Sequence, residues 1–360
     1  MARPALLSVP DAGYSWPELR DLLRPTLDAG ISALVLGHPG VGKSALAQDL
    51  AAHFGLPLVD IRLAQQDPAD LGGVYMPDAG RTTMRLLPPQ WVREVCAEPS
   101  FVFLDEVNAA VTRLHQAVAY QIVLEHRVGP FRFHPDTVVL AAGNLQEDEA
   151  LATGLSSALG NRFAHFQLRV DAPVWLQWAT AEGIDPRILA YVELHGRRVL
   201  YDRRSGEVAF ASPRSWAMAS RLLKRVPDTH ARQAVAACVG RRAAEQFAQF
   251  LKLYGRLKPD RIVLQGRMPR FTGANAEPSR VHATVVAVAD WACAHANAIP
   301  DDRLANLVRF LRVDGLDQEL WFLFLRRLAR ASDLVDRLKA LRVFRELAGE
   351  LVGLHAELYR

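Results

Sequence analysis

Eight residues, GHPGVGKS (37–44), have the spacing G-x-x-x-x-G-K-[ST], which is typical of a loop that binds phosphate groups. They follow the apolar run ISALVLG (31–37) and open the amphipathic run SALAQDLAAHF (44–54), the strand and helix context that this motif requires. Glycines let backbone N–H groups turn inward around phosphate oxygens, and the start of the helix adds partial positive charge. We therefore expect a nucleotide to contact Gly37, His38, Pro39, Gly40, Val41, Gly42, Lys43, Ser44 and Ala45.

Two of these side chains and an acidic pair downstream predict the chemistry. Lys43 is long enough to reach the β- and γ-phosphates of ATP, and the Ser44 hydroxyl suits Mg²⁺. In FVFLDEVN (101–108), four apolar residues predict a buried strand that delivers Asp105 and Glu106 to its C-terminal edge. We expect Asp105 to bind ATP and to hold Mg²⁺ together with Ser44, while Glu106 orients and polarises the attacking water. The pattern predicts an ATP hydrolase.

Two further polar residues stand where they could sense the γ-phosphate. Asn144 ends the apolar run TVVLAAGN (137–144), at the sheet edge where nucleotides bind in α/β proteins. In SPRS (212–215), Ser212 suits the N-cap of a helix and Pro213 its first position. Arg214 then lies in the first helical turn, where a cation opposes the helix dipole and a phosphate partner would offset that cost.

The surrounding sequence predicts how these residues are positioned. Apolar runs alternate with amphipathic stretches up to about residue 170, which indicates an α/β unit with a mainly parallel sheet, and helical patterns follow it. The predicted strands are 31–37, 56–63, 101–106, 137–143 and 163–170. We expect an αβα core over 1–170, a helical lid with Arg214 over 171–254, a linker over 255–279 and a helical C-terminal region over 280–360.

Composition limits the class of protein. Half of the 360 residues are apolar and 23% are charged, which indicates a folded chain of two or three domains. A net charge of +4 is too small to indicate nucleic-acid binding by itself. The widely spaced Cys96, Cys238 and Cys293 form no disulfide or metal pattern. With neither a signal-peptide pattern nor an apolar run of membrane-span length, we expect a cytoplasmic protein.

The motifs GHPGVGKS, LDEVNAA, AAGN, ALGNRF and SPRS, in this order, resemble those of AAA+ ATPases and most closely the MoxR branch. QQDPADLGG (65–73) is also similar to that branch. The resemblance covers about 37–220 and implies a P-loop αβα core with a five-stranded parallel sheet and a helical lid. It implies a homo-oligomeric ring, usually a hexamer, that remodels or activates a protein in a chaperone-like way. Members of the branch often act with a partner that carries a von Willebrand factor A domain.

The resemblance also implies roles for a third cation and two loops. Asn144 and Arg214 become the first and second sensors, and Arg162 in GNRF (160–163) becomes an arginine finger that reaches the γ-phosphate of the neighbouring subunit. Two insertions, 72–87 and 126–136, would face the central pore, and the first is predicted to form a hairpin around Asp78–Gly80. Ordinary surface loops are an equally good interpretation of both insertions.

Three other functions stay open from the sequence. A nucleic-acid motor or loader would use the basic stretch GRLKPDRIVLQGRMPR (255–270), but it has no aromatic residues for base stacking, and nucleic acid is the less favoured partner. A P-loop kinase would need an acceptor pocket and no finger. A nucleotide-binding protein without catalysis would leave Glu106 idle.

Overall fold

The computed structural model describes residues 13–80, 82–108, 112–145, 161–203, 206–254, 257–272, 277–347 and 349. Its contacts divide the chain into two compact units, and the division passes within α7 (Ala172–Ala181) and within α10 (Pro213–Leu223), whose first turn belongs to the core unit. The core unit comprises Met1–Trp175 with Ser212–Ser215, and the helical unit comprises Leu176–Ala211 with Trp216–Arg360. Arg214 therefore belongs to the same compact unit as the phosphate-loop residues.

The core unit is built on a five-stranded parallel sheet, as predicted from the alternating pattern. Its strand order is β2-β5-β8-β1-β9, so β8 lies between the strand that ends in Asp105 and the strand that precedes the phosphate loop. Because all five strands run the same way, their carboxyl ends meet at one edge. The strands are β1 (Ala33–Gly37), β2 (Leu58–Arg62), β5 (Phe101–Asp105), β8 (Val138–Gly143) and β9 (Ala164–Leu168).

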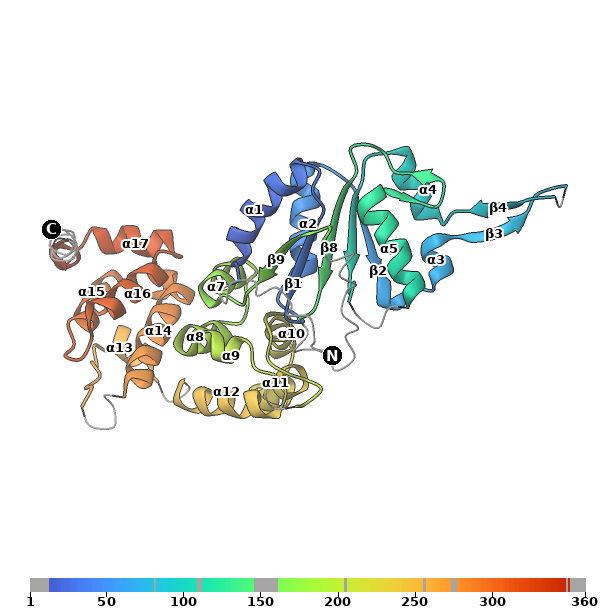
Figure 1. Ribbon diagram of the computed structural model, residues 1–360. Coiled ribbons are helices and arrows are strands. Elements are labelled where there is room, and N and C mark those ends of the chain that lie inside the picture. The colour runs from blue at the N-terminus through green and yellow to red at the C-terminus, as the bar shows by residue number, and fades with distance from the viewer. Residues whose placement is uncertain are drawn as a thin grey trace. The chain divides into compact units, whose positions relative to one another are not determined.

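Helices cover both faces of this sheet (Figure 1). Alternate residues of β5 point to opposite faces: Phe101 and Phe103 pack with α1 and α2, whereas Val102 and Leu104 pack with α3, α4 and α5. The strand residues of both apolar clusters are buried, which explains why the central strands appear as continuous apolar runs in the sequence. The helices are α1 (Trp16–Asp28), α2 (Lys43–Phe54), α3 (Pro68–Gly72), α4 (Gln90–Ala97) and α5 (Arg113–Glu125).

Two hairpins interrupt the α/β pattern at the predicted insertions. The strands β3 (Val74–Pro77) and β4 (Met84–Leu87) form an antiparallel ribbon, and Asp78 closes its turn by accepting bonds from the backbone and hydroxyl groups of Thr82 and Thr83. These bonds, above all from the backbone of Thr82, lower the pKa of Asp78. In the second insertion, β6 (Arg127–Val128) pairs with β7 (Phe131–Arg132). The hairpin predicted around Asp78–Gly80 is thus confirmed.

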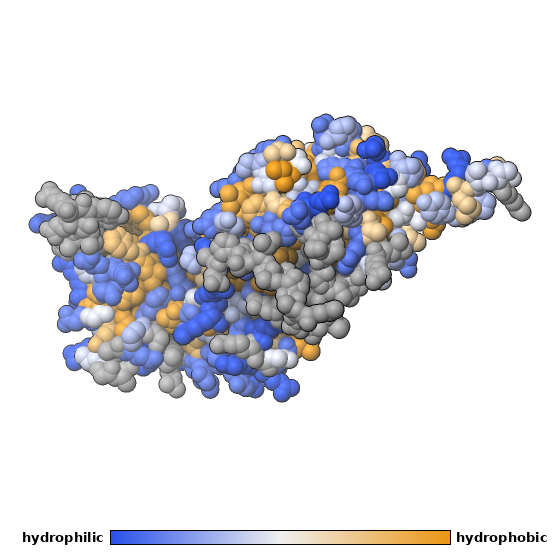
Figure 2. Space-filling model, viewed as in Figure 1, coloured by the Kyte–Doolittle hydropathy of each residue, from blue (hydrophilic) through white to orange (hydrophobic). Residues whose placement is uncertain are grey.

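The β3–β4 hairpin exposes apolar side chains on both of its faces. Tyr75 is 64% exposed, and Met76 and Met84 are exposed as well. In the space-filling view, orange and peach surface on the hairpin is interspersed with pale and blue surface (Figure 2). Opposite residues in an antiparallel pair share a face, so Met76 with Arg85 and Pro77 with Met84 lie on opposite sides of the ribbon. An isolated two-stranded ribbon of this kind is marginally stable in water.

The helical unit carries its own apolar core. Val288, Leu307, Phe310 and Phe324 are buried together in the C-terminal cluster. Ile262 and Val263 of α13 join it, so part of the stretch expected as a linker packs with the C-terminal helices. The helices are α8 (Pro186–His195), α9 (Arg197–Leu200), α10 (Pro213–Leu223), α11 (Ala231–Val239), α12 (Arg241–Tyr254), α13 (Pro259–Val263), α14 (Pro278–Ala294), α15 (Asp301–Leu311), α16 (Gln318–Leu328) and α17 (Ser332–Lys339).

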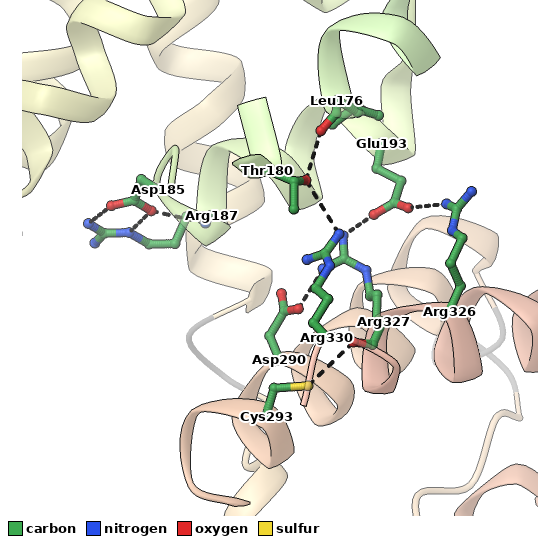
Figure 3. Close-up of polar contacts among 10 residues, drawn as sticks. All are labelled: Leu176, Thr180, Asp185, Arg187, Glu193, Asp290, Cys293, Arg326, Arg327 and Arg330. Atoms are coloured by element: carbon green, nitrogen blue, oxygen red, sulfur yellow. Dashed lines mark hydrogen bonds and ion pairs between the residues drawn. The ribbon is translucent and has the colours of Figure 1, made fainter. Parts of the chain in front are cut away.

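A buried ionic cluster joins three helices of this unit (Figure 3). Arg327 of α16 is only 1% exposed, and its guanidinium bonds to Glu193 of α8 and, at 2.5 Å, to Asp290 of α14. Arg326, on the surface of α16, donates to the other oxygen of Glu193 at 2.9 Å. Burial raises the pKa of Asp290, and the positive charge of Arg327 opposes that shift.

Over the described part of the chain, none of the helices has both the length and the apolar character that crossing a membrane requires.

Candidate nucleotide-binding site

The phosphate loop connects the end of β1 to the start of α2, as predicted. Gly40 and Gly42 have φ angles of +80° and +108°, in the left-handed region that side chains with a Cβ rarely adopt. A Cβ on Gly40 would lie 2.8 Å from the Ser212 hydroxyl oxygen. Lys43 is the first residue of α2, so the loop delivers its side chain at the helix N-terminus. Backbone conformation and space therefore both require glycine at position 40.

Lys43 and Asn144 meet at the carboxyl edge of the sheet. The Lys43 ammonium donates to the carbonyl oxygens of Gly37 at 2.7 Å and His38 at 3.1 Å, and to Asn144 Oδ1 at 2.8 Å. Asn144 directly follows β8, the strand next to β1. The lysine of the loop and the first-sensor candidate, 101 residues apart in sequence, thus form one polar centre.

Ser44 and Asp105 form a second pair beside the first. The Ser44 hydroxyl donates to Asp105 Oδ2 at 3.2 Å, and Asp105 is the last residue of β5. A hydroxyl and a carboxylate that lie this close together offer oxygen ligands of the type that Mg²⁺ prefers. The residues present therefore fit a magnesium ion at this point.

Glu106 has an unusual backbone for its residue type. Its φ is +58°, which is in the left-handed region, and its N–H donates to the side chain of Asp105 at 2.9 Å. A residue with a Cβ is strained there by roughly 1–2 kcal/mol, and such strain is concentrated at functional sites. The left-handed turn at Glu106 directly follows the last residue of β5.

The two arginines predicted at the site have different surroundings. The backbone N–H of Arg214 donates to the Gly40 carbonyl at 3.2 Å, so the start of α10 contacts the phosphate loop while the side chain of Arg214 is exposed. As predicted, Ser212 caps α10: its hydroxyl accepts from the Ser215 N–H at 3.1 Å. Arg162 is not joined to these groups. Within the described residues its one charge contact is with the Tyr120 ring, 5.6 Å from the centroid, and it is otherwise exposed.

Comparison with known families agrees with this site. Residues 32–163 match the sequence model of the AAA domain (dynein-related subfamily). These residues are an AAA domain. The AAA domain begins just before β1 and includes the phosphate loop, Asp105, Glu106, Asn144 and Arg162, whereas Arg214 lies beyond the matched region. It is therefore a P-loop domain of the AAA+ type, a class whose members bind nucleotide.

Solved structures resemble the chain only distantly. A putative ATPase from Cytophaga hutchinsonii is 16% identical over 64% of this chain and 88% of that chain, with a TM-score of 0.36. RuvB from Thermotoga maritima, a Holliday junction branch migration motor, is 16% identical over 71% and 78%, with a TM-score of 0.38. NtrX from Brucella abortus is 15% identical over 84% and 68%, with a TM-score of 0.39. None of the curated proteins matches the chain. Likenesses at this level carry no argument about function.

The AAA domain also contains a polar residue at the site that sequence reasoning missed. Asn108 is 5% exposed, and its carboxamide bonds to both the N–H and the carbonyl of Asn144. The available signal was an asparagine three residues after Asp105, a spacing that by itself favours only a turn.

A separate hollow in the helical unit is not part of this site. Its volume is about 520 Å³, and the rings of Tyr191 and Phe250, which contact each other, are part of its lining. Burial raises the pKa of Tyr191 to about 12 and lowers that of His195, which also lines the hollow. Its lining carries charges of both signs, on Arg198 and Asp202.

Proposed function

We propose that the chain is a MoxR-like AAA+ ATPase that hydrolyses ATP in an oligomeric ring and uses the energy to remodel or activate a protein partner. The observation that carries this proposal is the convergence at one sheet edge of Lys43 with Asn144 and of Ser44 with Asp105. The second pair matches the oxygen ligands of Mg²⁺, and the first matches groups that contact a γ-phosphate. Glu106 directly follows Asp105 in a turn with a left-handed φ, and backbone strain of this kind is concentrated at functional sites.

Each side chain has a distinct role in the proposed reaction. Lys43 holds the β- and γ-phosphates, and Asn144 holds the γ-phosphate and the attacking water in line. Glu106 orients and polarises that water. When bound by Ser44 and Asp105, Mg²⁺ would neutralise negative charge on the phosphates. Arg214, at the start of α10, reports on the γ-phosphate to the lid that we propose over 171–254.

Assembly into a ring, a hexamer in our proposal, gives Arg162 its role. Its guanidinium is exposed and is held over Tyr120 rather than in an ion pair within the described residues, which leaves its charge for a neighbouring subunit's γ-phosphate. Phe163, the next residue, is buried in the cluster of the α5 face and fixes the backbone beside it. A finger of this type raises the rate by about 10³–10⁵.

The exposed hairpins are the proposed grips on the protein partner. The β3–β4 hairpin carries apolar side chains on both faces, and exposed apolar surface of this kind is typical of protein interaction sites. We propose that this hairpin and β6–β7 face the pore. A protein with a von Willebrand factor A domain is the partner that we test first.

Phosphate release by the purified protein with Mg²⁺ and ATP tests the catalytic part of the proposal. Lys43→Ala is expected to lose tight ATP binding in calorimetry, and Glu106→Gln is expected to bind ATP, hydrolyse it very slowly and accumulate as an assembled ring. Glu98→Gln, a change of the same type at an exposed site on α4's C-terminus, is the control that leaves hydrolysis unchanged. Hydrolysis that is equal in the wild type and in Glu106→Gln would contradict the assignment.

Affinity purification with the ATP-bound Glu106→Gln protein tests the partner. We expect the Glu106→Gln protein to retain partner proteins in the presence of ATP, and the Lys43→Ala protein to retain none of them. Nuclease treatment of the same sample separates the competing function, because a nucleic-acid motor would retain nuclease-sensitive material with a steep dependence on salt.

A further inference from the structure

Asn108 lies between the two elements that the proposed reaction must align. The ladder between β5 and β8 ends with Leu104 opposite Ala141, and the chain then turns at Glu106. Beyond the turn, the Val107 N–H donates to the Ala142 carbonyl at 3.0 Å. The chain after β5 therefore stays attached to the β8 side although the regular strand has ended.

The side chain of Asn108 adds two further hydrogen bonds between this segment and the residue that follows β8. Its amide nitrogen donates to the Asn144 carbonyl at 2.7 Å, and its Oδ1 accepts from the Asn144 N–H at 3.0 Å. A carboxamide presents a donor and an acceptor side by side, as a peptide group does, so it satisfies both backbone groups of one residue. Aspartate of the same shape lacks the donor, and leucine of similar size lacks both groups.

The space around this contact is closely fitted. Asn108 is buried, and a Cβ added to Gly143 would lie 2.6 Å from its Oδ1. The residue before Asn144 must therefore remain glycine for the carboxamide to reach the backbone. Two positions far apart in the sequence are thus both constrained by this contact.

We infer that Asn108 is a positioning residue, which holds the Asn144 backbone and the Glu106 turn in one register so that the sensor amide and the water-orienting carboxylate are aligned together. The inference rests on the proposed function. Asn144 Oδ1 contacts Lys43, so the same backbone bonds also fix the distance between the phosphate-binding lysine and Glu106. A shift of about 1 Å in such an arrangement costs on the order of 100-fold in rate.

Steady-state ATP hydrolysis by Asn108→Asp and Asn108→Leu tests the inference. We expect kcat to fall by about 10- to 100-fold while KM for ATP stays within about threefold, because nucleotide contacts of the phosphate loop are unchanged. Asn306→Asp is the matched control: Asn306 is a buried asparagine of the helical unit whose amide donates to the Val263 carbonyl at 2.8 Å. It is expected to lower the melting temperature and leave kcat unchanged at a temperature where the protein is folded.

Gly143→Ala provides a second, independent variant if Asn108→Asp fails to fold. It leaves Asn108 in place but displaces its carboxamide, and we expect the same loss of kcat at nearly constant KM. Wild-type kcat in the folded Asn108 variants, or in Gly143→Ala, would overturn the inference while Glu106→Gln still abolishes hydrolysis. An inactive wild-type protein would instead reject the proposed function, and the inference with it.

Discussion

Replacement of Arg327 by methionine tests the ionic cluster of the helical unit. Methionine keeps much of the buried side-chain volume but leaves Glu193 and Asp290 without their shared cation. Glu193 retains Arg326, which is 74% exposed and so interacts weakly, whereas Asp290 Oδ2 already lacks a hydrogen-bond partner among the described residues. Removal of one member of a buried ion pair costs about 3–5 kcal/mol.

The loss of stability in Arg327→Met is limited by the free energy that Asp290 needs to become neutral once its cation is gone. It can take up a proton, and from its ordinary pKa of 3.8 this costs about 4 kcal/mol at pH 7 and about 2 kcal/mol at pH 5.5. Loss of Arg327 removes the charge that opposes the raised pKa, so the folded variant binds this proton more readily than the unfolded chain does. Its stability deficit is therefore expected to grow as the pH rises from about 4 to 7.

Urea denaturation of the variant at pH 7 and pH 5.5 measures both effects. Hydrogen exchange in α8, α14 and α16 checks that the loss is local to the cluster. Arg326→Met is the matched control, because it removes an exposed cation from the same carboxylate and is expected to cost less than about 1 kcal/mol. Adding Asp290→Asn to Arg327→Met should recover about 2 kcal/mol at pH 7. A cost below about 1 kcal/mol for Arg327→Met, or a double variant less stable than the single one, would refute this reasoning.

Three other predictions follow from the structure. Burial, the largest cause, lowers the pKa of His282 from its ordinary 6.5, so the free energy of unfolding should decline as the pH falls below about 6.5, and His282→Leu should reduce that decline in urea titrations at pH 7.5 and 5.5. Glu106→Gly should be more stable than Glu106→Ala by about 1 kcal/mol, because both lack the carboxylate and only glycine tolerates the positive φ; the opposite order would contradict the left-handed turn. Mixing Arg162→Ala with Glu106→Gln, each inactive alone, should restore phosphate release in mixed rings, and no recovery in rings verified by tag pull-down would place Arg162 outside a neighbour's site.

Sequence alone predicted the sheet because its determinants are local. The central strands β1, β5 and β8 are runs of mostly apolar residues, whereas β2 and β9 also carry polar ones, and both flanks of the phosphate loop have the required periodicity. Ser212 and Asp78 were predictable for the same reason, since an N-cap and a hairpin turn depend on side chains within five residues of the groups they bind.

The contacts that were missed depend on residues far apart in the chain. Asn108 binds a residue 36 positions away, and nothing in its neighbourhood separates that role from an ordinary turn. Arg327 lies in a run of arginines that is typical of a solvated helix face, yet it is buried because Glu193, 134 positions away, approaches it. Nothing in the sequence predicts the left-handed φ of Glu106, because the turn and not the residue type imposes that conformation.

The strand order of the sheet has a consequence for how the chain folds during synthesis. Both neighbours of β1, which are β8 and β9, are encoded about a hundred residues or more downstream. At 5–20 residues per second, β1 leaves the ribosome roughly 5–20 s before either partner exists. During that interval it is an apolar strand with two unpaired edges, which is the type of segment that aggregates or recruits a holding chaperone. The phosphate loop at its end likewise lacks Asn144, so nucleotide cannot stabilise the nascent core early. We therefore expect that ATP aids folding only after β8 has been added, as a late ligand that selects completed domains.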